Sequence, residues 1–277
     1  MDPMLKLSIA IAESSALPSA FVVFRGFEKH IQVASSLGYD GVELALKSVS
    51  EIKTDKLDRW LNDAGITVSC ISTGQVFADT GLMFTDADNY RRKTLLSIFK
   101  EMIDLAANYG QLVNIGRIRG NLDENDNGES LLRFTDMARE LCNYAETKGV
   151  TLVLEPVNRY EINFINSVEE GVELIKKISR PNMKLMPDVF HMNIEDVLIG
   201  EELAKYIDHI AYIHLADSNR MAPGWGHTDF EDIFRHLKKA KYNGWLSVEI
   251  LPKPEPYIAA KQAIDYLKPF LENNRNS

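Results

Sequence analysis

The sequence TLVLEPV, at residues 151–157, shows the pattern that decides the fold. It is an apolar run of strand length that ends in a glutamate, Glu155, and a proline. A strand without polar alternation is typical of a parallel sheet that is covered on both faces. Seven further runs of this kind occur along the chain, at Leu5–Ala12, Gly41–Leu46, Thr67–Thr73, Leu112–Ile118, Met183–Val189, Ile210–Asp217 and Trp245–Leu251.

Amphipathic stretches separate these runs. Between Tyr90 and Tyr109 apolar residues recur at the spacing of a helix, and Gly38, Gly110 and Gly149 stand where helical patterns stop before the next run. Strands that alternate with helices in this way predict a single-domain (β/α)8 barrel, a TIM barrel, over residues 1–277. The alternative is an open, doubly wound sheet. Met1–Pro3 precede a second methionine and are expected to be a cloning remnant.

The charge composition disfavours several classes of partner. The chain has 31 basic and 40 acidic side chains, a net charge of −9, which opposes binding to nucleic acid or to an anionic membrane. No apolar run reaches the roughly 18 residues of a membrane helix, and no signal peptide is recognisable. The two cysteines, Cys70 and Cys142, lie far apart in apolar surroundings and are expected to be buried free thiols. We therefore expect a cytoplasmic protein with neither a nucleic-acid nor a membrane partner.

Four potential metal ligands stand at the carboxyl ends of four consecutive predicted strands: Glu155, Asp188, His214 and Glu249. Catalytic residues of a (β/α)8 barrel lie at that end. Taken singly, a glutamate at a strand end more often caps a helix or forms a salt bridge. Together, three carboxylates and one imidazole suit Mn²⁺, Mg²⁺ or Co²⁺ better than structural zinc, and we predict one divalent ion, with Mn²⁺ first.

A metal ion between two glutamates favours enolisation. A Lewis acid that holds a ketone and the adjacent hydroxyl lowers the barrier to removing the proton between them. One glutamate of the pair Glu155 and Glu249 could take that proton, and the other could return it on the opposite face, which inverts the carbon. This division of roles requires environments that separate the pKa values of the two carboxyl groups.

Further polar residues lie close to the predicted ligands. Glu161 follows Glu155 by six residues, His191 follows Asp188 by three, and Arg220 follows His214 by six. We predict that these three residues contact a sugar-sized substrate, although a surface glutamate, a capping histidine and a solvated arginine are the simpler alternatives. Gln75, at the end of the third predicted strand, is a candidate contact for a substrate hydroxyl.

These motifs resemble the xylose isomerase-like TIM-barrel superfamily, and most of all its D-tagatose, D-psicose and L-ribulose 3-epimerase branch. The resemblance covers nearly the whole chain, and the segments that carry it are EPVNRYE (155–161), DVFHMN (188–193), HLADSNR (214–220) with PGWG (223–226), and GWLSVE (244–249).

The resemblance implies roles for individual residues. Glu155, Asp188, His214 and Glu249 would bind one divalent metal ion. Glu155 and Glu249 would also be the acid/base pair on the two faces of a cis-enediolate. His191 and Arg220 would hold the oxygen beside the reacting carbon, and Glu161 would contact the O1 end of the sugar. Because the enzymes of this branch are dimers or tetramers, the resemblance also implies that this chain forms a homodimer or a homotetramer.

A finer resemblance points to the bacterial 5-keto-L-gluconate epimerases, which interconvert 5-keto-L-gluconate and D-tagaturonate. It rests on STGQ (72–75), VNIGRIRG (113–120) and APGWGHTDF (222–230). A carboxylate substrate requires an additional cation, best an arginine. The candidates for binding this carboxylate are Arg25, Arg117 and Arg119, and the alternative for each is a salt bridge to the acidic loop Asp123–Asp126.

Other functions are less well supported. A 1,2-aldose–ketose isomerase, a hydroxypyruvate isomerase-like enzyme or an inosose dehydratase-type lyase could use the same first deprotonation. A non-catalytic sugar-binding protein would not need four metal ligands. The zinc-dependent apurinic endonucleases of the same superfamily carry histidines after strands three and four, where this chain has Ser72–Gln75 and Asn114–Gly116. By loop position alone, Phe24, Trp225 and Tyr257 are candidate pocket walls.

Overall fold

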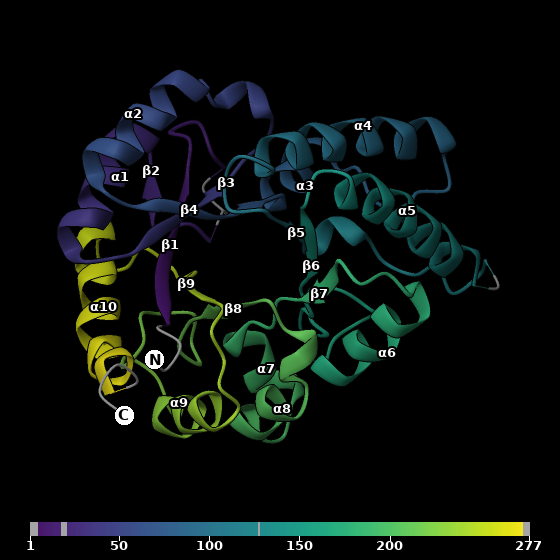
Figure 1. Ribbon diagram of the computed structural model, residues 1–277. Coiled ribbons are helices and arrows are strands. Elements are labelled where there is room, and N and C mark those ends of the chain that lie inside the picture. Colours follow the sequence, from purple (N-terminus) through teal and green to yellow (C-terminus); the bar gives the residue numbers. More distant parts are fainter. Residues whose placement is uncertain (1–4, 18–20, 127, 274–277) are drawn as a thin grey trace.

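A ring of parallel strands surrounded by helices makes up the computed structural model, which describes residues 5–17, 21–126 and 128–273 (Figure 1). The strands are β1 (Lys6–Ala12), β2 (Phe24–Arg25), β3 (Gly41–Ala45), β4 (Thr67–Ser72), β5 (Leu112–Ile115), β6 (Thr151–Leu154), β7 (Met183–Leu185), β8 (Tyr212–Leu215) and β9 (Trp245–Val248). The expected cloning remnant, Met1–Pro3, lies outside the described residues.

The helices follow the strands along the chain. The longer ones are α1 (Phe27–Leu37), α2 (Thr54–Ala64), α3 (Gly74–Thr80), α4 (Asn89–Ala106), α5 (Glu129–Glu146), α6 (Val168–Ile178), α7 (Val189–Glu195), α8 (Ile199–Lys205), α9 (Phe230–Lys239) and α10 (Pro256–Asn273). Three short 3-10 helices are η1 (Val49–Glu51), η2 (Arg117–Arg119) and η3 (Ile207–His209). Among the described residues, no helix is long and apolar enough to cross a membrane.

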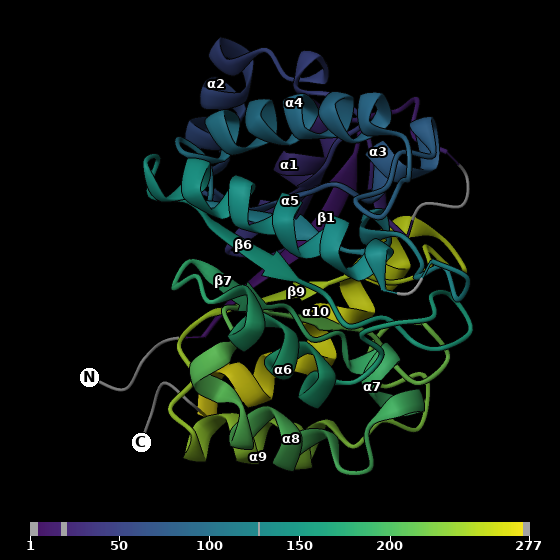
Figure 2. The ribbon, with the colours of Figure 1, turned by 90° about the vertical axis from the view of Figure 1, so that its right-hand side faces the viewer.

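The strand order closes a barrel. Parallel neighbours run β7-β6-β5-β4-β3-β1-β9-β8, and β2 pairs with β1 outside this path. Two parallel bridges, Leu185 with Ile210 and Asp188 with His214, join the region of β7 to that of β8 and complete the ring. The predicted single-domain (β/α)8 barrel is therefore confirmed, and the open sheet is excluded. In the side view, the helices lie outside the strands on both sides (Figure 2).

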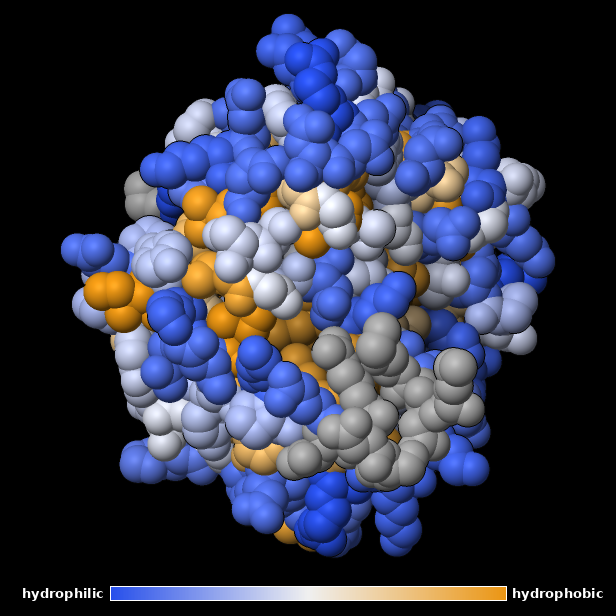
Figure 3. Space-filling view, turned by 60° about the vertical axis from the view of Figure 1, so that its left-hand side comes forward, coloured by the Kyte–Doolittle hydropathy of each residue, from blue (hydrophilic) through white to orange (hydrophobic). Residues whose placement is uncertain are grey.

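Apolar packing fills the layer between strands and helices. Strand residues such as Ile9, Val42 and Leu152 are fully buried, as are Phe99 of α4 and Leu141 of α5. Burial of an apolar side chain of this size contributes about 1.5–3 kcal/mol relative to an exposed one. On the outer surface drawn in Figure 3, hydrophilic residues dominate the rim and hydrophobic ones gather near the middle. Both cysteines are free and buried, as predicted.

Several strand ends differ from the predicted ones. The run Leu112–Ile118 ends as a strand at Ile115, and the chain then turns into η2. The run Met183–Val189 ends as a strand at Leu185, and the Asp188 carboxylate then accepts the backbone N–H of Phe190 at 2.8 Å at the start of α7. Sequence periodicity also missed β2, since two residues are too few to show a period. The expected stop at Gly38 is confirmed, because Gly38 ends α1 with a φ of 99°.

Candidate metal centre and active site

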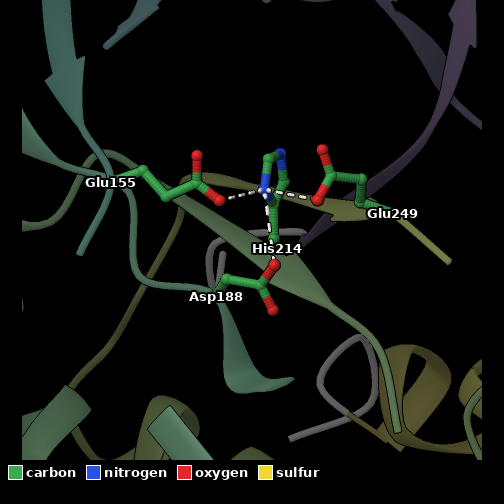
Figure 4. Close-up of side chains that lie close together, drawn as sticks. All are labelled: Glu155, Asp188, His214 and Glu249. Carbon is green, nitrogen blue, oxygen red and sulfur yellow. Dashed lines mark ion pairs between the residues drawn. The ribbon is translucent and has the colours of Figure 1, made fainter. Parts of the chain in front are cut away.

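The barrel brings the four predicted ligands together at one end. Glu155 follows β6, Asp188 precedes α7, His214 lies within β8, and Glu249 follows β9. Each offers one ligand atom, and these atoms all lie within 4.8 Å of one another. In Figure 4, Glu155 and Glu249 approach the His214 ring from opposite sides, and Asp188 approaches from a third direction.

The backbone holds the two glutamates in register with their neighbours. The Glu155 N–H donates to the carbonyl of Ile115 at 3.1 Å, and the Glu249 N–H donates to the carbonyl of Leu215 at 3.3 Å. Each glutamate is thus fixed to an adjacent strand although it stands just beyond its own. A carboxylate on rigid backbone of this kind loses little freedom when it binds an ion.

The Nδ1 atom of His214 is the centre of the cluster. It lies 3.5 Å from Glu155 Oε1, 3.7 Å from Glu249 Oε2 and 3.9 Å from Asp188 Oδ2. It is buried and has no hydrogen-bond partner among the described residues. A buried polar atom without a partner is costly, and three carboxylate oxygens around it make the donor set of a divalent cation. The residues present therefore fit a metal ion.

The other nitrogen of His214 is held by a residue that the sequence analysis missed. Nε2 lies 2.9 Å from Oε2 of Glu43, a fully buried glutamate on β3. A carboxylate can only accept this hydrogen bond, so Nε2 carries a proton and Nδ1 faces the cluster. A charged residue inside the apolar run GVELAL was the available signal, because a buried charge requires a partner.

The pKa values of the two glutamates are displaced in opposite directions. Burial alone would raise the pKa of Glu155, but the close approach and positive charge of His214, together with the charges of His191 and Arg220, lower it to about 2. Burial raises the pKa of Glu249 to about 8 against the opposing charges of Arg220 and His214, with Glu155 and Asp188 adding to the rise. The sequence-based requirement for two different environments is thus met.

Arg220 bridges two of the carboxylates. Its guanidinium donates to Asp188 Oδ2 and to Glu249 Oε2, and it packs against the rings of Phe21 and Phe190 with its carbon 4.9 and 5.0 Å from their centroids. Arg220 has a φ of 63°, a conformation that is rare outside glycine. Its carbonyl accepts the N–H of Leu251 at 2.8 Å, which ties this loop to the residues after β9.

A cavity opens beside the cluster, and the other residues predicted to contact the substrate line it. Its lining includes Gln75, Arg117, Glu161, His191 and Arg220. The Oε1 atom of Gln75 is buried and has no partner among the described residues. Arg117 Nη1 lies 3.3 Å from Glu161 Oε2, so these two residues form an ion pair at the cavity wall.

The three arginines that are candidates for binding a substrate carboxylate lie in different surroundings in the structure. Arg117 lines the cavity. Arg25 does not belong to its lining and donates to the carbonyl of Ala16 at 3.0 Å. Arg119 is fully buried, and its guanidinium donates to the carbonyls of Gly116, Glu155, Phe164 and Ile165. All five of its N–H groups are used, so the expectation that Arg119 binds a substrate carboxylate is wrong, and so is the alternative of a surface salt bridge.

The residues expected to form the pocket walls do not line the cavity in the structure. Phe24 is buried and stacks on His30, while Trp225 and Tyr257 lie on the outer surface in a separate shallow depression. The aromatic wall of the cavity is Phe21. Loop position alone misplaced the wall, because side chains of one loop can point to either side of it.

A comparison with models of protein families shows to which family this barrel belongs. Residues 31–270 match the family model described as xylose isomerase-like TIM barrel. The chain belongs to that family. This membership confirms the resemblance of the four motifs at the level of the superfamily.

The family members that match this chain include sugar epimerases. A D-psicose 3-epimerase of Enterocloster bolteae is 28% identical over 235 residues, which are 80% of this chain and 75% of the relative. An L-ribulose 3-epimerase of Methylomonas sp. is 28% identical over 237 residues, 81% of this chain and 78% of the relative. The predicted enzyme class, an isomerase of carbohydrates, is confirmed.

Solved structures agree with these matches. A structure of L-ribulose 3-epimerase superposes with a TM-score of 0.85 at 25% identity, covering 98% of this chain and 96% of the other. A D-allulose 3-epimerase from Methylomonas sp., in complex with D-allulose, gives a TM-score of 0.83 at 23% identity over 96% of this chain and 97% of the other, a likeness of fold. The finer resemblance to 5-keto-L-gluconate epimerases stays a prediction.

Replacing Glu43 tests the metal centre. We expect Glu43→Gln to weaken Mn²⁺ binding about 10- to 100-fold, because the carboxylate that orients His214 is lost. Isothermal titration calorimetry on metal-free protein measures this affinity. Ser8→Ala is the control, since Ser8 lies 2.9 Å from the Tyr212 hydroxyl in the same buried network but does not contact His214. Equal Mn²⁺ affinity in Glu43→Gln and wild type would contradict the orienting role.

Proposed function

We propose that this chain is a metal-dependent epimerase that inverts the carbon next to the carbonyl of a ketose or a keto sugar acid. The observation that carries the proposal is the arrangement of Glu155 and Glu249 on opposite sides of the unpartnered His214 Nδ1. Inversion needs a proton carrier on each face of the reacting carbon. A 1,2-aldose–ketose isomerase, hydroxypyruvate isomerase-like or dehydratase reaction does not require this opposed pair.

The metal would be held by Glu155, Asp188, His214 and Glu249, with Mn²⁺ first and Mg²⁺ or Co²⁺ as alternatives. When bound, a divalent ion supplies Lewis-acid polarisation of the carbonyl and the neighbouring hydroxyl. In one direction one glutamate accepts the proton from carbon and the other donates a proton to the opposite face. In the reverse direction the two glutamates exchange roles.

The remaining residues bind and orient the sugar. His191 Nε2 lies 4.0 Å from both Glu155 Oε1 and Asp188 Oδ2, so it can donate to a substrate oxygen beside them. Arg220 stabilises negative charge that develops on the same oxygen. Gln75 Oε1, which has no partner in the described part of the chain, offers an acceptor to a hydroxyl group, and Glu161 would contact the O1 end.

The substrate end of the cavity distinguishes two candidates. We propose a free ketose of the D-psicose, D-tagatose or L-ribulose kind first, because the matching relatives carry the names D-psicose and L-ribulose 3-epimerase. The pairing of Arg117 with Glu161 also suits a neutral sugar, since the charge of Arg117 is already balanced. The second candidate is the pair 5-keto-L-gluconate and D-tagaturonate, whose carboxylate would take Arg117 from Glu161.

The proposal also includes the partner, the location and the assembly that we expect from the sequence. The partner is a small sugar or sugar acid rather than nucleic acid or a membrane, the protein works in the cytoplasm, and it assembles as a homodimer or homotetramer. Size-exclusion chromatography with light scattering measures the last of these.

Substitution of either glutamate tests the chemistry. We expect Glu155→Gln and Glu249→Gln each to lower kcat by about 10²- to 10⁴-fold, because a proton carrier is lost. Sugar binding should persist, since the other contacts remain, and calorimetry with each variant measures it. Metal content is checked by elemental analysis, so that loss of the ion is not mistaken for loss of the base. A near-wild-type kcat in either metal-loaded variant would refute the two-glutamate mechanism.

The Arg117→Met variant tests the substrate class. If the substrate is a keto acid, kcat/KM for 5-keto-L-gluconate should fall about 10- to 100-fold, the loss of a charge-assisted hydrogen bond, and kcat/KM for D-psicose should change less. If the substrate is a ketose, wild type should already prefer D-psicose. Arg235→Met, a change at an exposed arginine on α9, is the matched control. A wild-type preference for the keto acid that survives Arg117→Met would rule out Arg117 as the carboxylate ligand.

A further inference from the structure

Asn158 lies in the loop after β6 and is almost completely buried. Its side-chain nitrogen is 2.7 Å from Nδ1 of His191 and 3.3 Å from Oε1 of Glu161. Its side-chain oxygen accepts the backbone N–H of Tyr160 at 3.0 Å. The amide nitrogen of Asn158 therefore has two partners, His191 and Glu161, and the amide oxygen has one, the N–H of Tyr160.

These contacts fix which way the amide faces. A backbone N–H can only donate, so the atom next to Tyr160 is the oxygen of Asn158. An ionised carboxylate can only accept, so the atom next to Glu161 is the nitrogen. The two criteria are independent and agree, and the NH₂ group that faces Glu161 also faces His191.

The orientation of the amide decides the proton position on His191. Because Asn158 donates to Nδ1, that nitrogen must present a lone pair, and a proton there would face the NH₂ group. The proton of the ring then lies on Nε2. Nε2 is the atom near Glu155 and Asp188, at 4.0 Å from a carboxylate oxygen of each, and His191 lines the cavity.

The two histidines of the site thus have partners of opposite polarity. Glu43 accepts from Nε2 of His214, which leaves Nδ1 facing the cluster. Asn158 donates to His191, which leaves an N–H facing the cavity. One imidazole is set to receive a cation and the other to donate to an oxygen.

The loop that carries Asn158 is fixed to the helix that carries His191. The Arg159 N–H donates to Glu195 Oε1 at 2.6 Å, and the Arg159 guanidinium lies 2.6 Å from Glu195 Oε2. Glu195 and His191 both belong to α7. The N–H groups of Glu161 and Ile162 also turn back to the Asn158 carbonyl, at 3.0 and 3.3 Å. The distance between Asn158 and His191 is therefore set by several bonds.

We propose that Asn158 is a positioning residue that holds His191 as the Nε2–H tautomer, so that this N–H donates to an oxygen of the bound substrate. Asn158 itself contacts no reacting atom. The part of this inference that concerns substrate rests on the proposed function, and the part that concerns the tautomer does not.

Asn158→Asp reverses the polarity of the bond with little change of shape. An aspartate keeps an oxygen for the Tyr160 N–H but presents an acceptor to His191 Nδ1, which draws a proton onto that nitrogen. Long-range ¹H–¹⁵N spectra of the Mg²⁺-loaded protein report which ring nitrogen is protonated. The chain has six histidines, and the His191 signals are assigned by their loss in His191→Gln.

Wild type should show the proton on Nε2, and Asn158→Asp should show it on Nδ1 or on both nitrogens. In Asn158→Asp, kcat/KM for the preferred sugar should fall about 10- to 100-fold. Glu161→Gln separates the two bonds of Asn158, because it removes the Glu161 charge and should leave the His191 tautomer unchanged. Asn163→Asp adds the same charge to an exposed part of the same loop and should leave both the tautomer and kcat/KM unchanged.

Three results would overturn the inference. The first is a wild-type spectrum with the His191 proton on Nδ1, a measurement that needs no variant to fold. The second is an unchanged tautomer in Asn158→Asp. The third is a reversed tautomer with an unchanged kcat/KM, which would remove the role in substrate binding. The spectra contain no substrate, so failure of the proposed epimerase reaction would leave the tautomer result standing.

Discussion

The concentration of negative charge around one buried imidazole is the constraint on which the rest of the site depends. Three carboxylates converge on His214 Nδ1, and a fourth, Glu43, holds the opposite nitrogen. Such a cluster requires compensating positive charge, which Arg220 supplies in part and a divalent ion would complete. The bridge between Asp188 and His214 that closes the barrel also brings two of these ligands side by side. The same contact therefore contributes both to the closure of the barrel and to the meeting of these two side chains.

Much of this arrangement follows from the sequence because each ligand interrupts or ends an apolar run. A glutamate after TLVL or WLSV stands at a strand end, and parallel strands of a barrel bring such ends together. The fold and the meeting of the four ligands were therefore predictable. The partners Glu43 and Asn158 were not, because their roles depend on contacts between segments far apart in the chain. Arg119 shows the same limit, since its motif resembles a substrate contact but its donors meet backbone carbonyls.

The direction of the hydrogen bonds gives residues of the same type different properties in this site. His214 and His191 are both buried near the same carboxylates, yet Glu43 accepts from one and Asn158 donates to the other. Glu155 and Glu249 differ in a similar way, because the positive charges around Glu155 lower its pKa while burial raises that of Glu249. The neighbouring residues, rather than the residue types, assign these roles. At the wall of the same cavity, Arg117 and Glu161 balance each other's charge.

Deuterium incorporation tests the central claim, that a proton is removed from the carbon beside the carbonyl and replaced on its other face. The protein, loaded with Mn²⁺, is incubated in D₂O with D-psicose, D-fructose, D-tagatose, L-ribulose and 5-keto-L-gluconate in turn, and each sugar is then analysed by NMR. The account predicts that one epimer accumulates with deuterium on the inverted carbon, and that EDTA abolishes the exchange until metal is restored. Accumulation of an epimer with no deuterium at that carbon, or undiminished exchange by metal-free protein, would contradict it.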